Sequence, residues 1–382
     1  MARVTERVEV AIVGAGAVGL LLGCLLAQRG VDLIVLERRP AVSRASRAIG
    51  IHPPGLAALD AAGVGDAVRR EAAGVEVGIA LGGGRELARV PFGDRRILSL
   101  PQHRTEALLR ERLAQLAPGA LRTGAELVGL QQSVSGQVEL ELADGARVAA
   151  RWAVGADGVR STVRRLLGIA WQPRPGVAAY AMADAPDRTG APGAALLCLE
   201  PDGIVESFPM PDGQRRWVAR LPGPSGPTRM EPLSLAALQR LLRERLGVAP
   251  ELPAAAKPSS FVARQRVATE FTRGRVALVG DAAHEISPIG GQGMSLGWLD
   301  AVAFDRALAS AAPHERDGAA LEGYARERGR AAARAVRRAA WNMRMGAPAH
   351  GAARVARLAL VRILGLPPAR SLLVSSFTMR GL

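Results

Sequence analysis

Three glycine-rich stretches contain the residues whose types and spacing could do chemistry. The first is Gly14-x-Gly16-x-x-Gly19, which lies between an apolar run at 8–13 and a helical pattern at 18–29. Glycines at this spacing permit a tight turn, a close approach of backbone to a pyrophosphate, and close packing of helix on strand. The start of the helix would present unpaired N–H groups and a positive dipole end to phosphates. This stretch therefore predicts a dinucleotide site.

An acid at the end of the next apolar run supports this interpretation. The run VDLIVLE at 31–37 completes a βαβ unit and ends in Glu37. A carboxylate at that point can accept the hydroxyls of an adenosine ribose. We also assign Ala17, Val18 and Arg38, which adjoin the glycines and Glu37, to the cofactor site. The motif leaves open whether the dinucleotide is NAD or FAD.

The second stretch, RWAVGADGVRSTVRRLLGI at 151–169, predicts a strand, a tight turn and then a helix. Asp157 lies in the turn, just before the expected start of the helix. An acid at such a position is as often a cap or turn former as a ligand contact. The residue type alone leaves both roles open for Asp157.

The third stretch, GDAAHEISPIGGQGMSLGWLDA at 280–301, follows the apolar run RVALV. It would place Gly280 and the carboxylate of Asp281 at the carboxyl edge of a sheet, where α/β proteins bind ligands. A glycine-rich loop then leads into a helix, whose free N–H groups would favour a developing negative charge. The candidate binding residues of this loop and helix start are Pro288, Gly291, Gly293, Met294 and Ser295.

Taken together and in this order, the three stretches resemble the single-component FAD-dependent aromatic hydroxylases, typified by para-hydroxybenzoate hydroxylase. The resemblance covers residues 8–330 and implies that FAD binds to all three stretches. The glycines of the first would meet the pyrophosphate, and Glu37 the adenosine ribose. Asp281 would hold the ribityl chain, and Pro288 with the loop 290–293 would lie against the isoalloxazine.

The resemblance also implies roles for residues outside the glycine-rich loops. Arg47 would lie near the FAD phosphates, and Gln102 and Arg104 would contact the ribityl chain. Asp157 would serve FAD and, transiently, NADPH or NADH as the reductant. Two positions depart from the family pattern, since Ser295 stands where Asn is usual and Leu299 where a polar residue is common. Because Ser keeps a small polar side chain, we still expect FAD to bind.

The activity implied by the resemblance is NAD(P)H-dependent hydroxylation of an electron-rich aromatic by O2, through a flavin hydroperoxide. An Ala-, Leu- and Val-rich chain with only two tyrosines, Tyr180 and Tyr324, favours a larger apolar phenol, polyketide or quinone precursor over a charged benzoate. No residue is assigned as catalytic acid or base, and His284 is interpreted as structural. A flavoprotein reductase of isoprenoid double bonds and a non-catalytic flavin-binding module remain as alternatives.

Two other classes of enzyme explain the sequence less well. A flavin-dependent halogenase depends on a lysine in its early region, whereas the single lysine of this chain is Lys257. A plain NAD dehydrogenase would explain the first glycine-rich stretch but not the other two.

The elements that must position these residues have the pattern of an α/β fold in two parts. We expect a Rossmann-like FAD-binding domain with a mainly parallel sheet, an antiparallel-sheet substrate domain, and a helical C-terminus. The FAD-binding domain is predicted at 1–74, 98–170 and 265–345, the substrate domain at 75–97 and 171–264, and the C-terminal tail at 346–382.

Composition narrows the partners of the chain. A net charge of +15 over 382 residues could indicate nucleic acid, but the arginines are not interleaved with aromatic residues, so none is expected. Two cysteines fit a reducing cytoplasm, and no metal site is predicted. The segment 351–366 predicts a basic surface helix that packs by its Leu face or makes a weak membrane-surface contact. The oligomeric state is left open.

Overall fold

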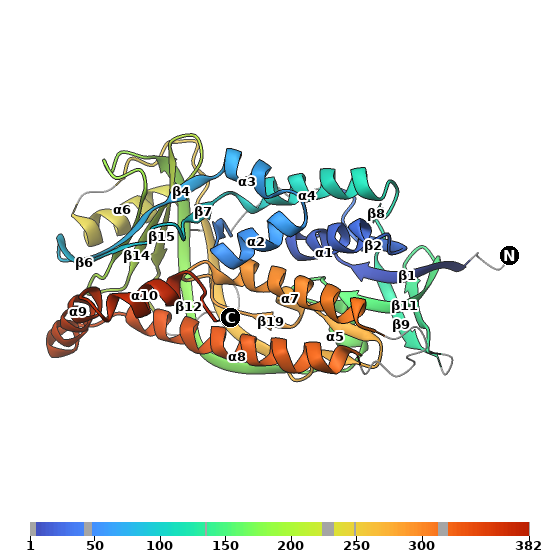
Figure 1. Cartoon of the computed structure of the whole chain (residues 1–382). Coiled ribbons are helices and arrows are strands. Elements are labelled where there is room, and N and C mark those ends of the chain that lie inside the picture. The colour runs from blue at the N-terminus through green and yellow to red at the C-terminus, as the bar shows by residue number, and fades with distance from the viewer. Residues whose placement is uncertain are drawn as a thin grey trace.

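The structure, a computed structural model, describes residues 5–41, 48–133, 136–223, 233–247, 250–311 and 320–381. These residues form two large sheets, a small sheet and a set of covering helices. Figure 1 shows the two large sheets toward opposite ends of an elongated molecule, with the C-terminal helices along one side. The predicted α/β class, with a mainly parallel sheet, an antiparallel sheet and a helical C-terminus, is confirmed.

The first large sheet is built around the βαβ unit that the sequence predicts. Its main path runs β17 (Thr272–Arg273), β18 (Val276–Leu278), β11 (Arg147–Gly155), β1 (Thr5–Val13), β2 (Leu33–Glu37) and β8 (Leu121–Thr123). The strands from β18 to β8 are parallel. The antiparallel strands β9 (Leu127–Gln132) and β10 (Val138–Leu142) extend the sheet beside β11. The turn at Asp144 and Gly145 joins β10 to β11.

The centre of this sheet is buried on both faces, as parallel strands require. Every residue of β2 is buried, and helix α1 (Ala17–Gln28) is buried along most of its length. Helix α1 packs on α4 (Gln102–Leu116) and on α7 (Gln292–Ala309). Enclosure from several sides explains why the α1 sequence GLLLGCLLA is apolar all round.

The second large sheet has the order β19 (His284–Glu285), β16 (Ser259–Ala268), β12 (Trp171–Pro186), β15 (Gln214–Arg220), β14 (Val205–Pro209), β13 (Ala194–Cys198), β5 (Val77–Gly82) and β6 (Arg85–Pro91). All neighbours are antiparallel except β13 and β5. The hairpin β5–β6 turns at Gly83 and Gly84 and joins the sheet built from 171–268. The 16-residue strand β12 is not predicted, because Pro173 and Pro175 argue against a strand interior.

The remaining elements connect and cover these sheets. They are β3 (Gly50–Ile51), β7 (Ile97–Ser99) and β4 (Ala73–Val75) of the small sheet, helices α2 (Pro53–Ala61), α3 (Gly65–Glu71), α5 (Thr162–Leu166), α6 (Leu235–Leu246), α8 (Ala320–Met345), α9 (Gly351–Gly365) and α10 (Arg370–Phe377), and the 3-10 helix η1 (Gly280–Ala282). None of the described helices combines the length and the apolar character that crossing a bilayer demands.

The C-terminal helices do more than form a tail. Helix α9 contacts β6, and α10 contacts both α9 and β6. Figure 1 shows both helices beside the second sheet. Helix α9 packs through part of its Leu face, where Leu358 lies against Gly82, yet it leaves Val355 69% exposed and Ile363 60% exposed. The expected packing by a Leu face therefore covers only part of the apolar surface of α9.

Candidate functional site

One cavity of about 540 Å³ is lined by loops that follow strands of the first large sheet, by the second large sheet and by the C-terminal helices. This is within the range of 300–1,000 Å³ typical of small-molecule sites. Its walls come from the loop before α1, from the inner face of the second sheet, from the loop before α7, and from α9 and α10. Representative lining residues are Gly16, Ala17, Val18, Met182, Val218, Asp281, Gly293, Leu364 and Phe377.

Glycine is needed at the three motif positions after β1 for different structural reasons. Gly14 has a φ of +107°, and a Cβ there would lie 2.5 Å from the Ala156 carbonyl oxygen. At Gly19 a Cβ would lie 2.0 Å from the Gly14 oxygen, so this glycine permits the close helix–strand packing. A Cβ at Gly16 would meet nothing nearer than a Glu106 carboxylate oxygen at 3.9 Å, and Gly16 lines the cavity. The first and third glycines thus serve the fold, and the second leaves room for a ligand.

Two helix N-termini open on this cavity. Helix α1 has Gly16 as its N-cap, and α7 has Gly291, which adopts a left-handed conformation with φ +67°. Neither end has a side-chain cap hydrogen bond within the described chain. The positive dipole ends of two helices therefore face the cavity at two points. This arrangement suits one extended ligand with negative charge near each of the two helix ends.

The carboxylate of Glu37 bonds to the loop before α1. Its Oε2 accepts a hydrogen bond from the Ala15 N–H at 3.0 Å, and its Oε1 accepts from the Arg39 N–H at 2.9 Å. Burial alone would raise the pKa of Glu37, but these bonds and the Arg39 guanidinium hold it below its usual value. Glu37 is buried outside the cavity lining, and the neighbouring Arg38 is exposed. The predicted Arg47 lies outside the described residues.

Asp157 acts as a cap for helix α5 in this structure. Its Oδ2 accepts hydrogen bonds from the N–H groups of Thr162 at 2.6 Å and Val163 at 3.1 Å. Its Oδ1 is buried without a partner in the described chain, and burial raises the pKa of the group. The neighbouring Ala156 and Gly158 line the cavity. Asp157 thus has the capping role that the sequence left open. It performs this role with Oδ2, and Oδ1 has no partner among the described residues.

The structure separates the two residues predicted at the ribityl chain. Gln102 lines the cavity and donates a hydrogen bond to Glu106 at 2.8 Å. Arg104 is outside the cavity lining, because both ends of its guanidinium bond to the Glu71 carboxylate at 3.0 Å. Two residues along helix α4 turn the side-chain direction by about 200°, so these two side chains point in different directions.

The loop before α7 supplies the other end of the site. Asp281, Pro288, Gly291, Gly293 and Met294 all line the cavity, as the sequence predicts for a common site. Asp281 is open to the cavity but held away from bulk water, and this loss of hydration raises its pKa to about 6. The backbone therefore brings a carboxyl group to the wall beside the start of α7.

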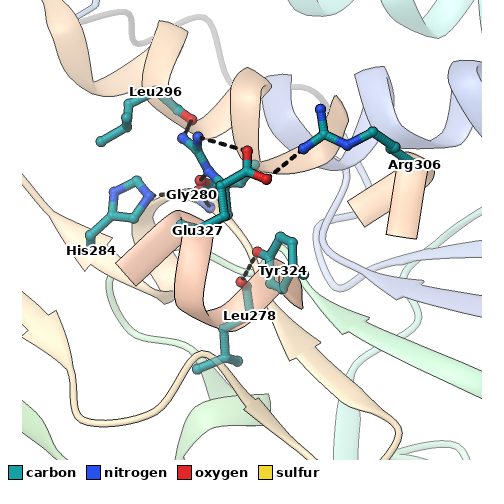
Figure 2. A network of polar contacts seen from close by, with 9 residues as sticks. Leu278, Gly280, His284, Leu296, Arg306, Tyr324 and Glu327 are labelled. Carbon is teal, nitrogen blue, oxygen red and sulfur yellow. Dashed lines mark hydrogen bonds and ion pairs between the residues drawn. The ribbon is translucent and has the colours of Figure 1, made fainter. Parts of the chain in front are cut away.

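Behind this loop lies a buried polar network that the sequence did not reveal. Asp300 accepts hydrogen bonds from Arg328 Nε at 2.6 Å and from the Gly280 N–H at 2.9 Å, and it also contacts His284. Figure 2 shows His284 and Gly280 in this network, with the Tyr324 hydroxyl bonded to the Leu278 carbonyl beside it. Gly280 and His284 do not line the cavity. They hold the turn that presents Asp281, which agrees with a structural role for His284.

Ser295 and Trp298 are also structural. The Ser295 hydroxyl accepts a hydrogen bond from the His52 N–H at 3.2 Å, and Trp298 Nε1 donates to the Ala17 carbonyl at 3.0 Å. Both side chains are fully buried against Gly55. Ser295, predicted to bind the cofactor, therefore joins α7 to α2 and does not line the cavity.

Several cavity residues had no recognisable signal in the sequence. Glu206 and Arg216 belong to short strands of the second sheet, and His52 precedes α2. Phe377 lies 31 residues after the start of the predicted tail at 346 and reaches the wall only because α10 folds back, where its ring packs edge-on against Phe92. Long-range pairing brings these residues together, so a motif search along the chain does not find them.

A sequence-family profile described as "FAD binding domain" matches residues 7–339, which covers most of the chain. The chain belongs to this family of FAD-binding proteins. The resemblance to single-component FAD-dependent aromatic hydroxylases is thereby confirmed, and FAD fits the residues present. The open space at Gly16 and the two uncapped helix ends are the features into which this cofactor would fit.

Similar proteins include enzymes of more than one kind. A rifampicin monooxygenase from Streptomyces venezuelae is 33% identical over 323 residues, which is 82% of this chain and 66% of that protein. A dialkyldecalin synthase from Streptomyces rugosporus is 33% identical over 341 residues, 85% of this chain and 70% of that one. The chain spans between 55% and 66% of the length of several curated relatives that it matches.

Among solved structures, a p-nitrophenol 4-monooxygenase from Pseudomonas putida superimposes with a TM-score of 0.85 at 26% identity. The match covers 99% of this chain and 100% of that one. The described arrangement, including the C-terminal helices, thus has a counterpart in a monooxygenase of similar size.

Proposed function

We propose that this protein is an NAD(P)H-consuming, FAD-dependent monooxygenase that hydroxylates an electron-rich aromatic compound. The observation that carries the proposal is the two-sided cavity. One side presents the Gly16 loop and the start of α7, which suit FAD, and the other is the apolar face of the second sheet. When bound, FAD would take electrons from NAD(P)H and pass one oxygen atom of O2 to the ring.

The chain's own residues would bind the cofactor and exclude water. The α1 N-terminus, with Gly16, Ala17 and Val18, would hold the pyrophosphate, and Glu37 would accept the adenosine hydroxyls. Asp281 and Gln102 would hold the ribityl chain. The α7 N-terminus beyond Gly291 would stabilise negative charge on the reduced ring system.

The substrate half favours an aromatic compound larger and less polar than a simple benzoate. Aliphatic residues such as Met182, Leu197 and Val218 form the sheet face, and Leu364 and Phe377 close the opposite side. Related proteins named for tetracycline and rifampicin chemistry support a polyketide-type phenol. We place the protein in the cytoplasm, where NAD(P)H is available, and leave the position of hydroxylation open.

Two other activities are distinguished by the same assay. A flavoprotein reductase of double bonds would consume NAD(P)H without transferring oxygen. The similarity to a dialkyldecalin synthase is a reason to test also for a reaction without net redox change. The assay follows NAD(P)H oxidation and O2 uptake by FAD-loaded protein with a panel of phenols and polycyclic phenols, and mass spectrometry identifies the products. A product heavier by one oxygen supports the proposal. A product heavier by two hydrogens, or an isomer of the substrate, contradicts it.

A further inference from the structure

Glu206 places a carboxyl group in the middle of the apolar sheet face that lines the substrate half of the cavity. Glu206 lies on β14, directly opposite Val218 of β15 on one side and Leu197 of β13 on the other. The same lateral row continues to Met182 and Ala80. Every one of these neighbours lines the cavity. The row is therefore an apolar strip interrupted once, by Glu206.

Among the described residues, none pairs with the carboxyl group of Glu206. The residue is only 2% exposed and yet lines the cavity. Within the described part of the chain its carboxyl makes no hydrogen bond and no ion pair. Buried carboxyl groups are ordinarily paired, because an unsatisfied one costs free energy. A buried group left open toward a substrate cavity is the arrangement expected when the substrate supplies the missing partner.

We propose that Glu206 binds an acidic hydroxyl group on an otherwise uncharged aromatic substrate and accepts its proton. This inference rests on the function proposed above and adds to it a catalytic base and a substrate class. In the step, the O–H bond of the substrate breaks and the O–H bond of the Glu206 carboxylic acid forms. The electron pair stays on the substrate oxygen, where it raises the electron density of the ring. No oxidant or reductant takes part in this step.

The electrostatics of the site agree with this role. Burial raises the pKa of Glu206 to about 8. A base with a pKa near neutrality is well matched to a phenol, whose pKa is about 10. A carboxylate-bearing substrate would bring a second acid into the apolar pocket beside Glu206, which like-charge repulsion disfavours. The cavity thus selects for a neutral molecule with a hydroxyl group.

Other titratable groups face the same space. Burial lowers the pKa of His52 to about 4, and the pKa of Asp281 is about 6. Arg216 of β15 lines the cavity and pairs with Asp184 at 2.7 Å. The further charged or titratable groups of the cavity wall and the sheet face are Arg264, Glu285, Tyr180 and Arg220. Burial raises the pKa of Tyr180 well above its usual value, and the charge of Glu206 adds to that effect.

The test measures binding of 1-naphthol to the FAD-loaded protein by equilibrium dialysis, without NAD(P)H, from pH 6 to pH 10. The charged acceptor binds a hydroxyl more strongly than the neutral acid does, so affinity should rise about tenfold through pH 8 and fall as naphthol ionises. Glu206→Gln keeps the shape of the side chain, and its profile should be flat up to the ionisation of naphthol. Naphthalene, which lacks the hydroxyl, should bind equally to both proteins at every pH.

The controls keep a folding defect from being mistaken for the effect. Glu86→Gln changes an exposed acid on β6 of the same sheet and should leave the profile intact. If Glu206→Gln takes up less FAD than the wild type, Glu206→Leu replaces it, because an apolar side chain suits this strip and should also abolish the rise. A rise through pH 8 that persists in the Glu206 variant overturns the proposal.

Measurement of turnover distinguishes a failure of the proposed function from a failure of the role of Glu206. If the wild type shows the pH-dependent rise but oxidises no aromatic compound, the proposed function fails and the binding role of Glu206 stands. If the wild type hydroxylates a phenol and Glu206→Gln does so with unchanged kcat at pH 8, the role of Glu206 as a base fails. The base role predicts a loss of about 100-fold or more in kcat.

Discussion

The Nε2 atom of His284 lies 2.6 Å from the Oδ2 atom of Asp300, and both side chains are fully buried. The other oxygen of Asp300 accepts from Arg328, so a single carboxylate joins β19, α7 and α8 behind the cavity wall. We predict that Asp300→Asn lowers the free energy of unfolding by about 3–5 kcal/mol, because it leaves the Arg328 guanidinium buried without its counter-ion.

Urea unfolding of the FAD-free protein measures this loss. Asp305→Asn is the matched control on the same helix, where a more exposed pair with Arg29 should contribute less than about 1 kcal/mol. Equal unfolding midpoints for the two variants would show that the Asp300 network is not the support inferred from its contacts.

The same network predicts how stability depends on acid. Burial alone would raise the pKa of Asp300, but His284 and Arg328 outweigh it and hold the pKa below its usual value. A carboxyl with a lowered folded-state pKa contributes stability above its unfolded pKa of about 4, and that contribution is lost as the pH falls further. The difference in stability between wild type and Asp300→Asn should therefore shrink below pH 4. A difference that stays constant down to pH 2 would contradict this linkage.

Gly16 and Gly19 should respond differently to alanine. At Gly16 a Cβ projects into the cavity and meets no protein atom nearer than 3.9 Å, so Gly16→Ala should fold normally and bind FAD at least about tenfold more weakly. At Gly19 the Cβ would lie 2.0 Å from a backbone oxygen, so Gly19→Ala should destabilise the fold itself. Thermal unfolding of each apoprotein and flavin absorbance of each protein after loading with FAD separate the two effects. A Gly16→Ala protein that retains full flavin content refutes the assignment of the pyrophosphate site.

Asp281 should be needed for the cofactor and not for the fold. Because burial raises the pKa of Asp281, we expect that its ionised carboxylate does not stabilise the apoprotein. Asp281→Asn should therefore leave the unfolding temperature of the apoprotein unchanged or slightly higher, while less FAD remains bound after gel filtration. Unchanged flavin content would contradict the role assigned to this carboxylate.

The position of α10 at the cavity wall predicts that a change there alters how much NAD(P)H is consumed per hydroxylated product. Phe377 lines the cavity and packs against Phe92, so Phe377→Ala should admit water and lower the ratio of hydroxylated product to NAD(P)H consumed. Leu372→Ala, on the exposed side of the same helix at 69% exposure, should leave that ratio unchanged. Equal coupling in both variants would show that α10 is not part of the functional wall.

The sequence predicts the cofactor half of the site far better than the substrate half. The Gly16 loop and the loop before α7 are each local strand–turn–helix units, so spacing along the chain determines their geometry. Glu206 and Phe377 reach the cavity only through strand pairing and helix return over long separations. Their environment is created by the assembled sheet, and no short pattern encodes it.

Two residues predicted at the cofactor lie outside the cavity lining for a common physical reason. Arg104 and Ser295 lie within a few residues of cavity positions, but their side chains point to Glu71 and His52. Side-chain direction changes by about 100° per residue along a helix. A motif therefore fixes which segment reaches the site without fixing which neighbouring side chain faces it.

The central claim, that the cavity holds FAD for oxygen transfer to an aromatic ring, is tested most directly with isotopically heavy dioxygen. FAD-loaded protein is given NADPH or NADH, a polycyclic phenol and ¹⁸O2, and the product is analysed by mass spectrometry. We predict a product that carries one ¹⁸O atom and is absent when Asp281→Ala protein without flavin is used. A product without ¹⁸O, or a purified protein that takes up no FAD, would contradict the account.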